Sequence, residues 1–223
     1  MTARGLFVTG TDTGVGKTRV AVALIHLLRE RGLRVAAMKP VSAGSAPGEL
    51  NEDVVALLQA ANVTAALRDV NPYAFADPVA PHIAAQQAGV CIDLETIAAA
   101  YSRLAAAADV VVVEGAGGWR VPLNAQQDMA DLAQRLDLPV VLVVGLRLGC
   151  LNHALLTAES IAFRQLPWAG WVGNQIEPEM PFRAENLAAL RARLPAPCLG
   201  VQDFFPQKAV MAESPQWLTL PTE

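Results

Sequence analysis

The chain has 223 residues, of which 53% are hydrophobic and 17% are charged, and its formal net charge is −4 at pH 7. This composition excludes intrinsic disorder. Without a run of Lys and Arg, the sequence also argues against a nucleic-acid or anionic-membrane surface.

The length suits one α/β domain covering residues 1–223. Cys91, Cys150 and Cys198 form no C-x-x-C pair, which favours a reduced setting over a disulfide framework or a zinc site. A strand-like segment follows residues 1–4 at once, which leaves no room for a signal peptide, and no apolar run approaches a membrane span. We therefore expect a soluble cytoplasmic protein with neither a membrane nor a nucleic-acid partner.

Strand and helix patterns alternate along the chain. Short apolar segments predict strands at 6–9, 33–38, 110–113, 139–144, 168–173 and 198–201. Apolar residues at helical spacing predict helices at 17–31, 52–61, 94–108 (capped by Asp93), 129–136, 152–164 and 181–194. Residues 41–49 and 64–92 are expected to be irregular, and the Pro-punctuated tail from Phe204 shows no regular pattern.

This alternation predicts the fold class. The unbroken β-branched run Val110–Val113 is typical of a strand buried on both faces of a parallel sheet. Such strands alternating with helices predict a doubly wound, mostly parallel α/β sheet with helices on both faces, as in P-loop NTPases. Ligands of these folds bind beyond the carboxyl ends of the strands. The residues to consider there are Thr13, Lys17, Lys39, Glu114 and Asn174.

Residues 10–18, Gly-Thr-Asp-Thr-Gly-Val-Gly-Lys-Thr, match the phosphate-loop pattern between a predicted strand and a predicted helix. Backbone N–H groups of such a loop surround phosphate oxygens, and the helix N-terminus favours negative charge. Lys17 would reach the terminal phosphates, and the Thr18 hydroxyl would ligate Mg²⁺. A glycine-rich turn that binds nothing is the competing interpretation. The pattern predicts a nucleoside triphosphate site comprising Gly10, Thr13, Gly14, Val15, Gly16, Lys17 and Thr18.

Three charged residues lie near this loop in the predicted fold. Glu114 ends a strand, where it is either a solvated acid or a carboxylate that holds Mg²⁺ against the triphosphate. The glycines that follow it would let the backbone approach a ligand closely. Lys39 is either an ordinary surface lysine or a second cation that neutralises a transferring phosphoryl group. By position alone, Asp53 is an acid near the start of a helix, where the helix dipole stabilises its negative charge.

Several motifs occur in the order found in the dethiobiotin synthetase family. They are residues 10–18, Lys39-Pro40-Val41, Asn71-Pro72-Tyr73 with Pro81-His82, Val-Glu-Gly-Ala-Gly-Gly at 113–118, Leu-Gly-Cys-Leu-Asn-His-Ala at 148–154, and Gly170-Trp171-Val172 leading to Asn174. The phosphate loop alone is unspecific, whereas this ordered set covers about residues 4–201 and is highly specific. The chain therefore closely resembles this family.

The resemblance implies an ATP- and Mg²⁺-dependent ligase of biotin biosynthesis that acts on 7,8-diaminononanoate and CO₂. One amine would capture CO₂ as a carbamate, and the carbamate would attack the ATP γ-phosphate. The other amine would then close the carbamic–phosphoric anhydride to a cyclic urea. Lys17, Lys39 and Mg²⁺ would offset the repulsion between the two anions. The resemblance also implies a homodimer with the substrate site near its interface.

The resemblance carries over to single residues. Lys39, Lys17 and Thr13 match catalytic positions. Thr18, Asp53 and Glu114 match the Mg²⁺ ligands, which replaces the dipole interpretation of Asp53. Asn174 matches the asparagine that reads the adenine edge. The remaining positions implied for ATP are Gly115, Ala116, Gly117 and Gln175.

The implied substrate site departs from the family pattern in places. The family often has a hydroxyl residue at position 43, where this chain has Ala43, while Ser42 stands one place earlier. Gly14 occupies a position that is acidic in some relatives, and Gln175 stands where an aspartate is expected. The helix start Gly149–Asn152 would receive the substrate carboxylate, because helix N-termini bind anions. The implied substrate residues are Thr13, Lys39, Ser42, Ala43, Gly118, Cys150, Leu151 and Asn152.

Three other functions are compatible with a phosphate loop in this fold. A partition- or division-type ATPase switch usually has lysine after the first loop glycine, where this chain has Thr11. An amidoligase resembling cobyrinic acid synthases needs an attached glutaminase domain, for which we expect no room in 223 residues. A small-molecule kinase is the third alternative.

Overall fold

Parallel strands form the centre of the computed structural model, which describes residues 4–46, 48–205 and 215–221. The strands are β1 (Arg4–Gly10), β2 (Val35–Met38), β3 (Val41–Ala43), β4 (Tyr73–Phe75), β5 (Val110–Glu114), β6 (Val140–Leu146), β7 (Trp168–Gln175) and β8 (Cys198–Gln202). The helices are α1 (Lys17–Glu30), α2 (Glu52–Ala60), α3 (Leu67–Val70), α4 (Pro81–Gln87), α5 (Leu94–Ala107), α6 (Met129–Leu136), α7 (Cys150–Phe163) and α8 (Arg183–Arg193).

The main sheet has the strand order β2-β5-β1-β6-β7-β8, and each neighbouring pair is parallel. A separate parallel pair joins β3 to β4. Every residue of β5 and β6 is buried, as the β-branched run predicts. The expectation of a doubly wound, mostly parallel sheet is confirmed.

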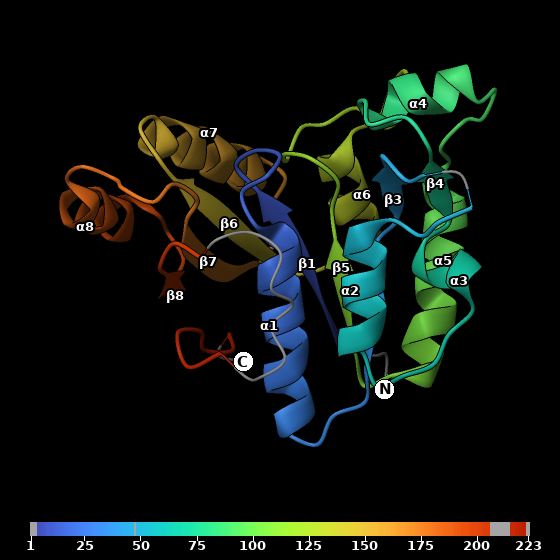
Figure 1. Ribbon diagram of the computed structural model, residues 1–223, viewed down its shortest axis with the longest axis horizontal. Coiled ribbons are helices and arrows are strands. Elements are labelled where there is room, and N and C mark those ends of the chain that lie inside the picture. The colour runs from blue at the N-terminus through green and yellow to red at the C-terminus, as the bar shows by residue number, and fades with distance from the viewer. Residues whose placement is uncertain (1–3, 47, 206–214, 222–223) are drawn as a thin grey trace.

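The two faces of the sheet bury different helices because successive side chains of a strand point to opposite sides. In β5, Val110 and Val112 belong to the apolar cluster that contains α1, whereas Val111 and Val113 belong to the cluster of α5 and α6. Leu142 of β6 joins a third cluster with α7 and α8. Figure 1 shows α1 and α2 side by side in front of the sheet, with α7 and α8 together at its far end.

The expectation of irregular structure at 41–49 and 64–92 is wrong in part. Residues 41–43 and 73–75 pair as β3 and β4, and residues 67–70 and 81–87 are helical. These segments are too short for their periodicity to be recognised in a sequence. Other differences lie at element ends: α7 begins at 150 rather than 152, α8 begins at 183 rather than 181, and β6 continues to 146.

Part of the C-terminal tail returns to the main sheet. Leu218 forms an isolated antiparallel bridge with Gly200 of β8. Residues 206–214 and 222–223 of the unassigned tail from Phe204 lie outside the described residues. Among the helices that the structure describes, none is both long and apolar enough to cross a membrane.

The sheet brings the predicted strand-end residues to a single edge. Lys39 follows β2, Glu114 ends β5, and Asn174 lies one residue before the end of β7. The phosphate loop leaves β1, which pairs with β5 on one side and β6 on the other. Because all these strands run in parallel, their carboxyl ends meet around the loop.

Candidate functional site

The phosphate loop joins β1 to α1 in a conformation that requires glycine. Gly14 and Gly16 have φ angles of 74° and 90°, values that side chains rarely permit. The Thr11 N–H donates to the carbonyl of Val143 at 2.9 Å, and the Gly145 N–H donates to the Thr11 hydroxyl at 3.3 Å. The loop is therefore anchored to β6.

Lys17 begins α1, and its side chain is buried under the loop. Its ammonium donates to the carbonyl of Asp12 at 3.0 Å. Burial lowers the pKa of Lys17 to about 8, although the Glu114 carboxylate opposes the shift. The Lys17 side chain thus sits beneath the phosphate loop, as its predicted role at the terminal phosphates requires.

An ion pair joins the loop to the segment before α7. The Arg147 guanidinium lies 2.5 Å from the Asp12 carboxylate, and the Thr13 N–H donates to the same carboxylate at 2.7 Å. The Thr13 N–H, together with Arg147, lowers the pKa of Asp12. The sequence predicted no role for Arg147, because no local pattern links the two segments. The pair connects the loop to the residues that precede α7.

Four of the predicted residues meet beside the loop although they come from separate parts of the chain. The Lys39 ammonium lies 2.5 Å from Glu114 Oε1 and 2.7 Å from Asp53 Oδ2. Thr18 Oγ1 lies 2.9 Å from Glu114 Oε1 and 2.7 Å from Asp53 Oδ1. Lys39 is only 4% exposed and Glu114 is fully buried. Their burial excludes both the surface-lysine and the solvated-acid interpretations.

Opposite charges hold this cluster together. Burial by itself would lower the pKa of Lys39, but Glu114 and Asp53 outweigh it and raise that pKa above its ordinary value. Burial likewise acts to raise the pKa of Asp53, yet Lys39 and the Thr18 hydroxyl bring it below the usual range. Lys39 is therefore an ammonium at neutral pH. Within the described residues, Glu114 Oε2 is buried without a hydrogen-bond partner.

The turn after β5 contacts the phosphate loop directly. A Cβ added to Gly118 would lie 3.7 Å from Asp12 Cα and from the Gly10 carbonyl oxygen. A Cβ added to Gly117, whose φ is 63°, would lie 3.5 Å from Thr13 Oγ1. The two glycine-rich segments therefore form adjoining walls of one site.

Asn174 supports the loop from β7. Its side-chain amide is buried and donates to the Val15 carbonyl at 2.8 Å. The same nitrogen lies 2.2 Å from the position that a Cβ on Gly16 would occupy. The next side chain, Gln175, donates to the carbonyls of residues 177 and 178 at 3.0 Å. The geometry thus adds a loop-supporting contact to the adenine contact predicted for Asn174.

A glycine substitution tests this contact. Gly16→Ala should destabilise the fold by at least about 1 kcal/mol more than Gly14→Ala, because the new methyl displaces the Asn174 hydrogen bond. Gly14→Ala is the matched control: its φ is also positive, but beyond its chain neighbours no atom lies within 4 Å of the added Cβ. Denaturant unfolding would measure the difference. Equal losses of stability would contradict a structural role for the Asn174 contact.

Comparison with known proteins adds to this geometry. A family model described as an AAA domain matches residues 4–208. The ATP-dependent dethiobiotin synthetase BioD of Nitrosospira multiformis is 54% identical over 198 residues, covering 89% of this chain and 87% of the relative. BioD of Xanthomonas oryzae pv. oryzae is 49% identical over 218 residues, covering 96% and 97%. The chain belongs to the dethiobiotin synthetase family.

Family membership makes the chain an ATP-dependent ligase, a dethiobiotin synthetase of biotin biosynthesis. Solved structures share its fold at low identity. MinD of Aquifex aeolicus has a TM-score of 0.56 at 15% identity, covering 92% of this chain and 84% of that chain. MinD of Pyrococcus horikoshii, complexed with Mg-ADP, has a TM-score of 0.56 at 18% identity, covering 90% and 81%. These likenesses show a P-loop NTPase-like fold.

In this dethiobiotin synthetase, the predicted substrate residues near β3 are largely engaged within the protein. The Ser42 hydroxyl is buried and donates to Asn71 Oδ1 at 2.9 Å. The Ala43 carbonyl accepts from Asn51 Nδ2 at 3.2 Å. The Ser42 side chain is therefore committed to Asn71, which the sequence singled out only as part of a family motif.

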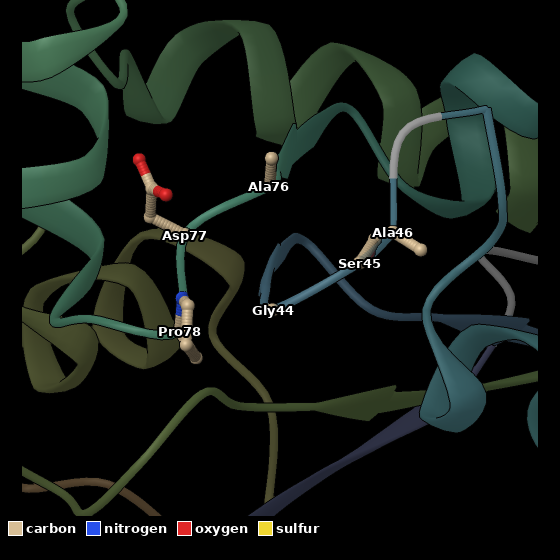
Figure 2. Close-up of a pocket in the computed structure, with 6 residues that line it drawn as sticks. All are labelled: Gly44, Ser45, Ala46, Ala76, Asp77 and Pro78. Atoms are coloured by element: carbon tan, nitrogen blue, oxygen red, sulfur yellow. The ribbon is translucent and has the colours of Figure 1, made fainter.

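A shallow, open depression of about 410 Å³ follows directly after β3. Figure 2 shows its two walls, one formed by Gly44, Ser45 and Ala46 and the other by Ala76, Asp77 and Pro78. None of the predicted catalytic residues lines it, so the depression does not contain the charged cluster.

The other predicted substrate residues begin α7. Gly149, with φ of 93°, precedes the helix, and α7 itself starts at Cys150. Cys150 is buried, Leu151 is half-buried and Asn152 is exposed. The first turn of α7 thus follows closely on Arg147, which pairs with the phosphate loop.

Proposed function

We propose that this chain closes the ureido ring of dethiobiotin from 7,8-diaminononanoate and CO₂, with conversion of ATP to ADP and phosphate. The observation that carries the proposal is the convergence of Lys39, Asp53, Glu114 and Thr18 beside the phosphate loop. The dethiobiotin synthetase relatives supply the identity of the product. The geometry supplies cations and oxygen ligands where a triphosphate would react.

The proposed reaction has three steps. An amine nitrogen adds to CO₂ and loses a proton, which forms a carbamate. A carbamate oxygen then attacks the γ-phosphorus, and ADP leaves. Finally the second amine attacks the carbonyl carbon of the carbamic–phosphoric anhydride and loses a proton, and phosphate leaves as the ring closes.

The two lysines have separate roles in this scheme. The second step brings two anions together, so its barrier falls if fixed cations stand beside the reacting oxygens. Lys39 remains protonated at neutral pH because of its carboxylate partners. It is therefore suited to stabilise negative charge and not to act as a base. Lys17 belongs to the loop and would bind the terminal phosphates. Thr13, beside the glycine turn, would contact the reacting phosphoryl group.

The residues of the cluster fit a Mg²⁺ ion. Mg²⁺ prefers oxygen ligands, and Thr18, Asp53 and Glu114 would supply a hydroxyl and two carboxylates. Glu114 Oε2 is buried and unpartnered among the described residues, as suits an atom that a cation can satisfy. The described residues contain no group of three His, Cys, Asp or Glu side chains suited to a metal, so water and phosphate would complete the ligand set. When bound, Mg²⁺ would neutralise charge on the triphosphate.

We propose the remaining contacts from the resemblance to the dethiobiotin synthetase family. The backbone of Gly10–Thr18 and the turn Gly115–Gly117 would surround the triphosphate, while Asn174 and Gln175 would face the adenine. The diamine would lie near the Ser42 backbone, Ala43 and Gly118. Its carboxylate would bind at the first turn of α7, residues Cys150, Leu151 and Asn152.

We also propose a cytoplasmic homodimer that forms from the single domain of residues 1–223. Three exposed apolar side chains on and beside α7 support this assembly. Leu148 is 98% exposed, Phe163 is 89% exposed and Leu156 is 56% exposed. Exposed apolar side chains of this kind favour protein–protein contact. Such a contact would place the start of α7 near a partner subunit.

An assay with omitted substrates tests the proposed function. Protein supplied with ATP, Mg²⁺, bicarbonate and 7,8-diaminononanoate should release phosphate in step with formation of the cyclic urea. Omission of either the diamine or bicarbonate should reduce phosphate release to background. Hydrolysis that continues without the diamine and ignores bicarbonate would contradict the proposal and would favour the partition- or division-type ATPase switch.

A further inference from the structure

We propose that Asn71 is a positioning residue that fixes the backbone of Lys39, so that the Lys39 ammonium reaches the reacting groups. This role rests on the proposed function, in which Lys39 acts as a cation. Asn71 follows α3 and touches none of the residues proposed to bind Mg²⁺ through any hydrogen bond of the described chain. Among the proposed catalytic residues of the described chain, Asn71 is hydrogen-bonded to Lys39 alone.

The side-chain amide of Asn71 is buried and uses both of its polar atoms. Nδ2 donates to the Lys39 carbonyl at 2.6 Å and to the Tyr73 carbonyl at 3.2 Å. Oδ1 accepts from the Ser42 hydroxyl at 2.9 Å. An amide with two donated bonds and one accepted bond has a single orientation. Asn71 thus ties together the two segments that flank it in space.

Lys39 depends on these contacts because it lies beyond its own strand. The pairing of β2 with β5 ends at Met38, so the neighbouring strand does not hold Lys39. Its N–H instead donates to the Val70 carbonyl at 2.8 Å, and the next carbonyl, Pro40, accepts from Tyr73 at 3.2 Å. Residues 70–73 therefore hydrogen-bond to the backbone before and after Lys39, and the Asn71 amide bonds to the Lys39 carbonyl between them.

Small movements at this point have large consequences. The Lys39 ammonium contacts the Glu114 and Asp53 carboxylates at 2.5 and 2.7 Å. At these distances a small displacement of Lys39 would break both contacts. A misplacement of about 1 Å can reduce a catalysed rate about 100-fold. The loss of the Asn71 amide would free the backbone that carries Lys39 without removing any charge.

The other end of β2 offers a matched control. Asn62 Oδ1 accepts from the Val35 N–H at 2.7 Å, and its Nδ2 donates to the Leu33 carbonyl at 3.0 Å. Asn62 therefore braces the start of β2 with the same chemistry that Asn71 uses beyond its end. Asn62→Ala removes a comparable set of hydrogen bonds at the opposite end of the strand from Lys39.

A double-mutant cycle tests the proposal. Asn71→Ala should lower kcat for cyclic urea formation about 100-fold while the Kd for ATP changes little. In a Lys39→Ala background, Asn71→Ala should have no further effect on kcat, because interacting residues are not additive. Asn62→Ala should leave kcat within about twofold in either background, since distant sites act independently.

Two results would overturn the proposal. One is a fall in kcat on Asn71→Ala that multiplies with that of Lys39→Ala. The other is a kcat for Asn71→Ala that matches that of Asn62→Ala. If Lys39→Ala itself keeps full kcat, the proposed function fails as well, and that result is distinct from either of these.

If Asn71→Ala does not fold, Ser42→Ala provides a second test of the same proposal. It removes only the hydroxyl that orients the Asn71 amide, so it should lower kcat less than Asn71→Ala without raising the KM for the diamine. This effect should also vanish in the Lys39→Ala background. A raised KM with an unchanged kcat would instead show that Ser42 acts on the substrate and would contradict its role through Asn71.

Discussion

Lys39→Ala is expected to lower kcat by about 100- to 1,000-fold, the loss seen when one charge-stabilising group is removed from a transition state. The Kd for ATP titrated without a divalent cation should change little, because the Lys39 ammonium contacts Glu114 and Asp53 rather than the phosphate loop. Single-turnover phosphate release and an equilibrium nucleotide titration would measure the two quantities separately.

Lys17→Ala provides the contrast for this experiment. Lys17 lies within the loop and contacts the Asp12 carbonyl, so its loss should weaken ATP binding itself. A collapse of ATP binding in Lys39→Ala would show that Lys39 serves the nucleotide and not the reacting carbamate. Because a broken buried ion pair costs about 3–5 kcal/mol, unfolding curves should first establish that each variant is folded.

Lys39→Met is expected to tighten the binding of a divalent cation by tenfold or more, measured without nucleotide. The ammonium contacts the same carboxylates that are proposed to ligate Mg²⁺, so the two cations compete for them. Close charge pairs couple by about 1.5–7 kcal/mol, and about 1.4 kcal/mol already corresponds to tenfold. Titration with Mn²⁺, followed by electron paramagnetic resonance, would give the affinity directly.

Two further variants control for charge and for the ligands. Lys17→Met removes an equal charge nearby, but its ammonium contacts neither carboxylate, so the gain in affinity should be smaller. Glu114→Gln should abolish tight Mn²⁺ binding, because it removes a proposed ligand charge. Unchanged affinity in Lys39→Met would contradict the assignment of Asp53 and Glu114 as metal ligands.

Much of the fold follows from local patterns. Four successive valines predicted the buried strand β5, and Asp93 caps α5 as expected, since its carboxylate accepts from the N–H groups of Glu95 and Thr96. The pair β3 and β4 was missed because three residues carry no periodicity and their pairing is set by distant contacts. The strands of the main sheet were therefore more predictable than the two short strands of the second sheet.

The site was predictable only from the rule that ligands of such sheets bind beyond the carboxyl ends of the strands. That rule placed Lys39 and Glu114 on one edge, but their contact depends on the adjacency of β2 and β5, which local sequence does not encode. Asp53 lies in the first turn of α2, where its position in the sequence predicted an acid stabilised by the helix dipole. It also forms an ion pair with Lys39. Asn71 and Arg147 were not assigned roles, because their partners become neighbours only in the folded chain.

The most direct test of the proposed reaction follows the carbon of CO₂. Protein supplied with ¹³C-bicarbonate, ATP, Mg²⁺ and 7,8-diaminononanoate should yield dethiobiotin that carries the label in its ring carbonyl, detected by mass spectrometry together with an equal amount of phosphate. Phosphate release without labelled dethiobiotin would contradict the proposed function.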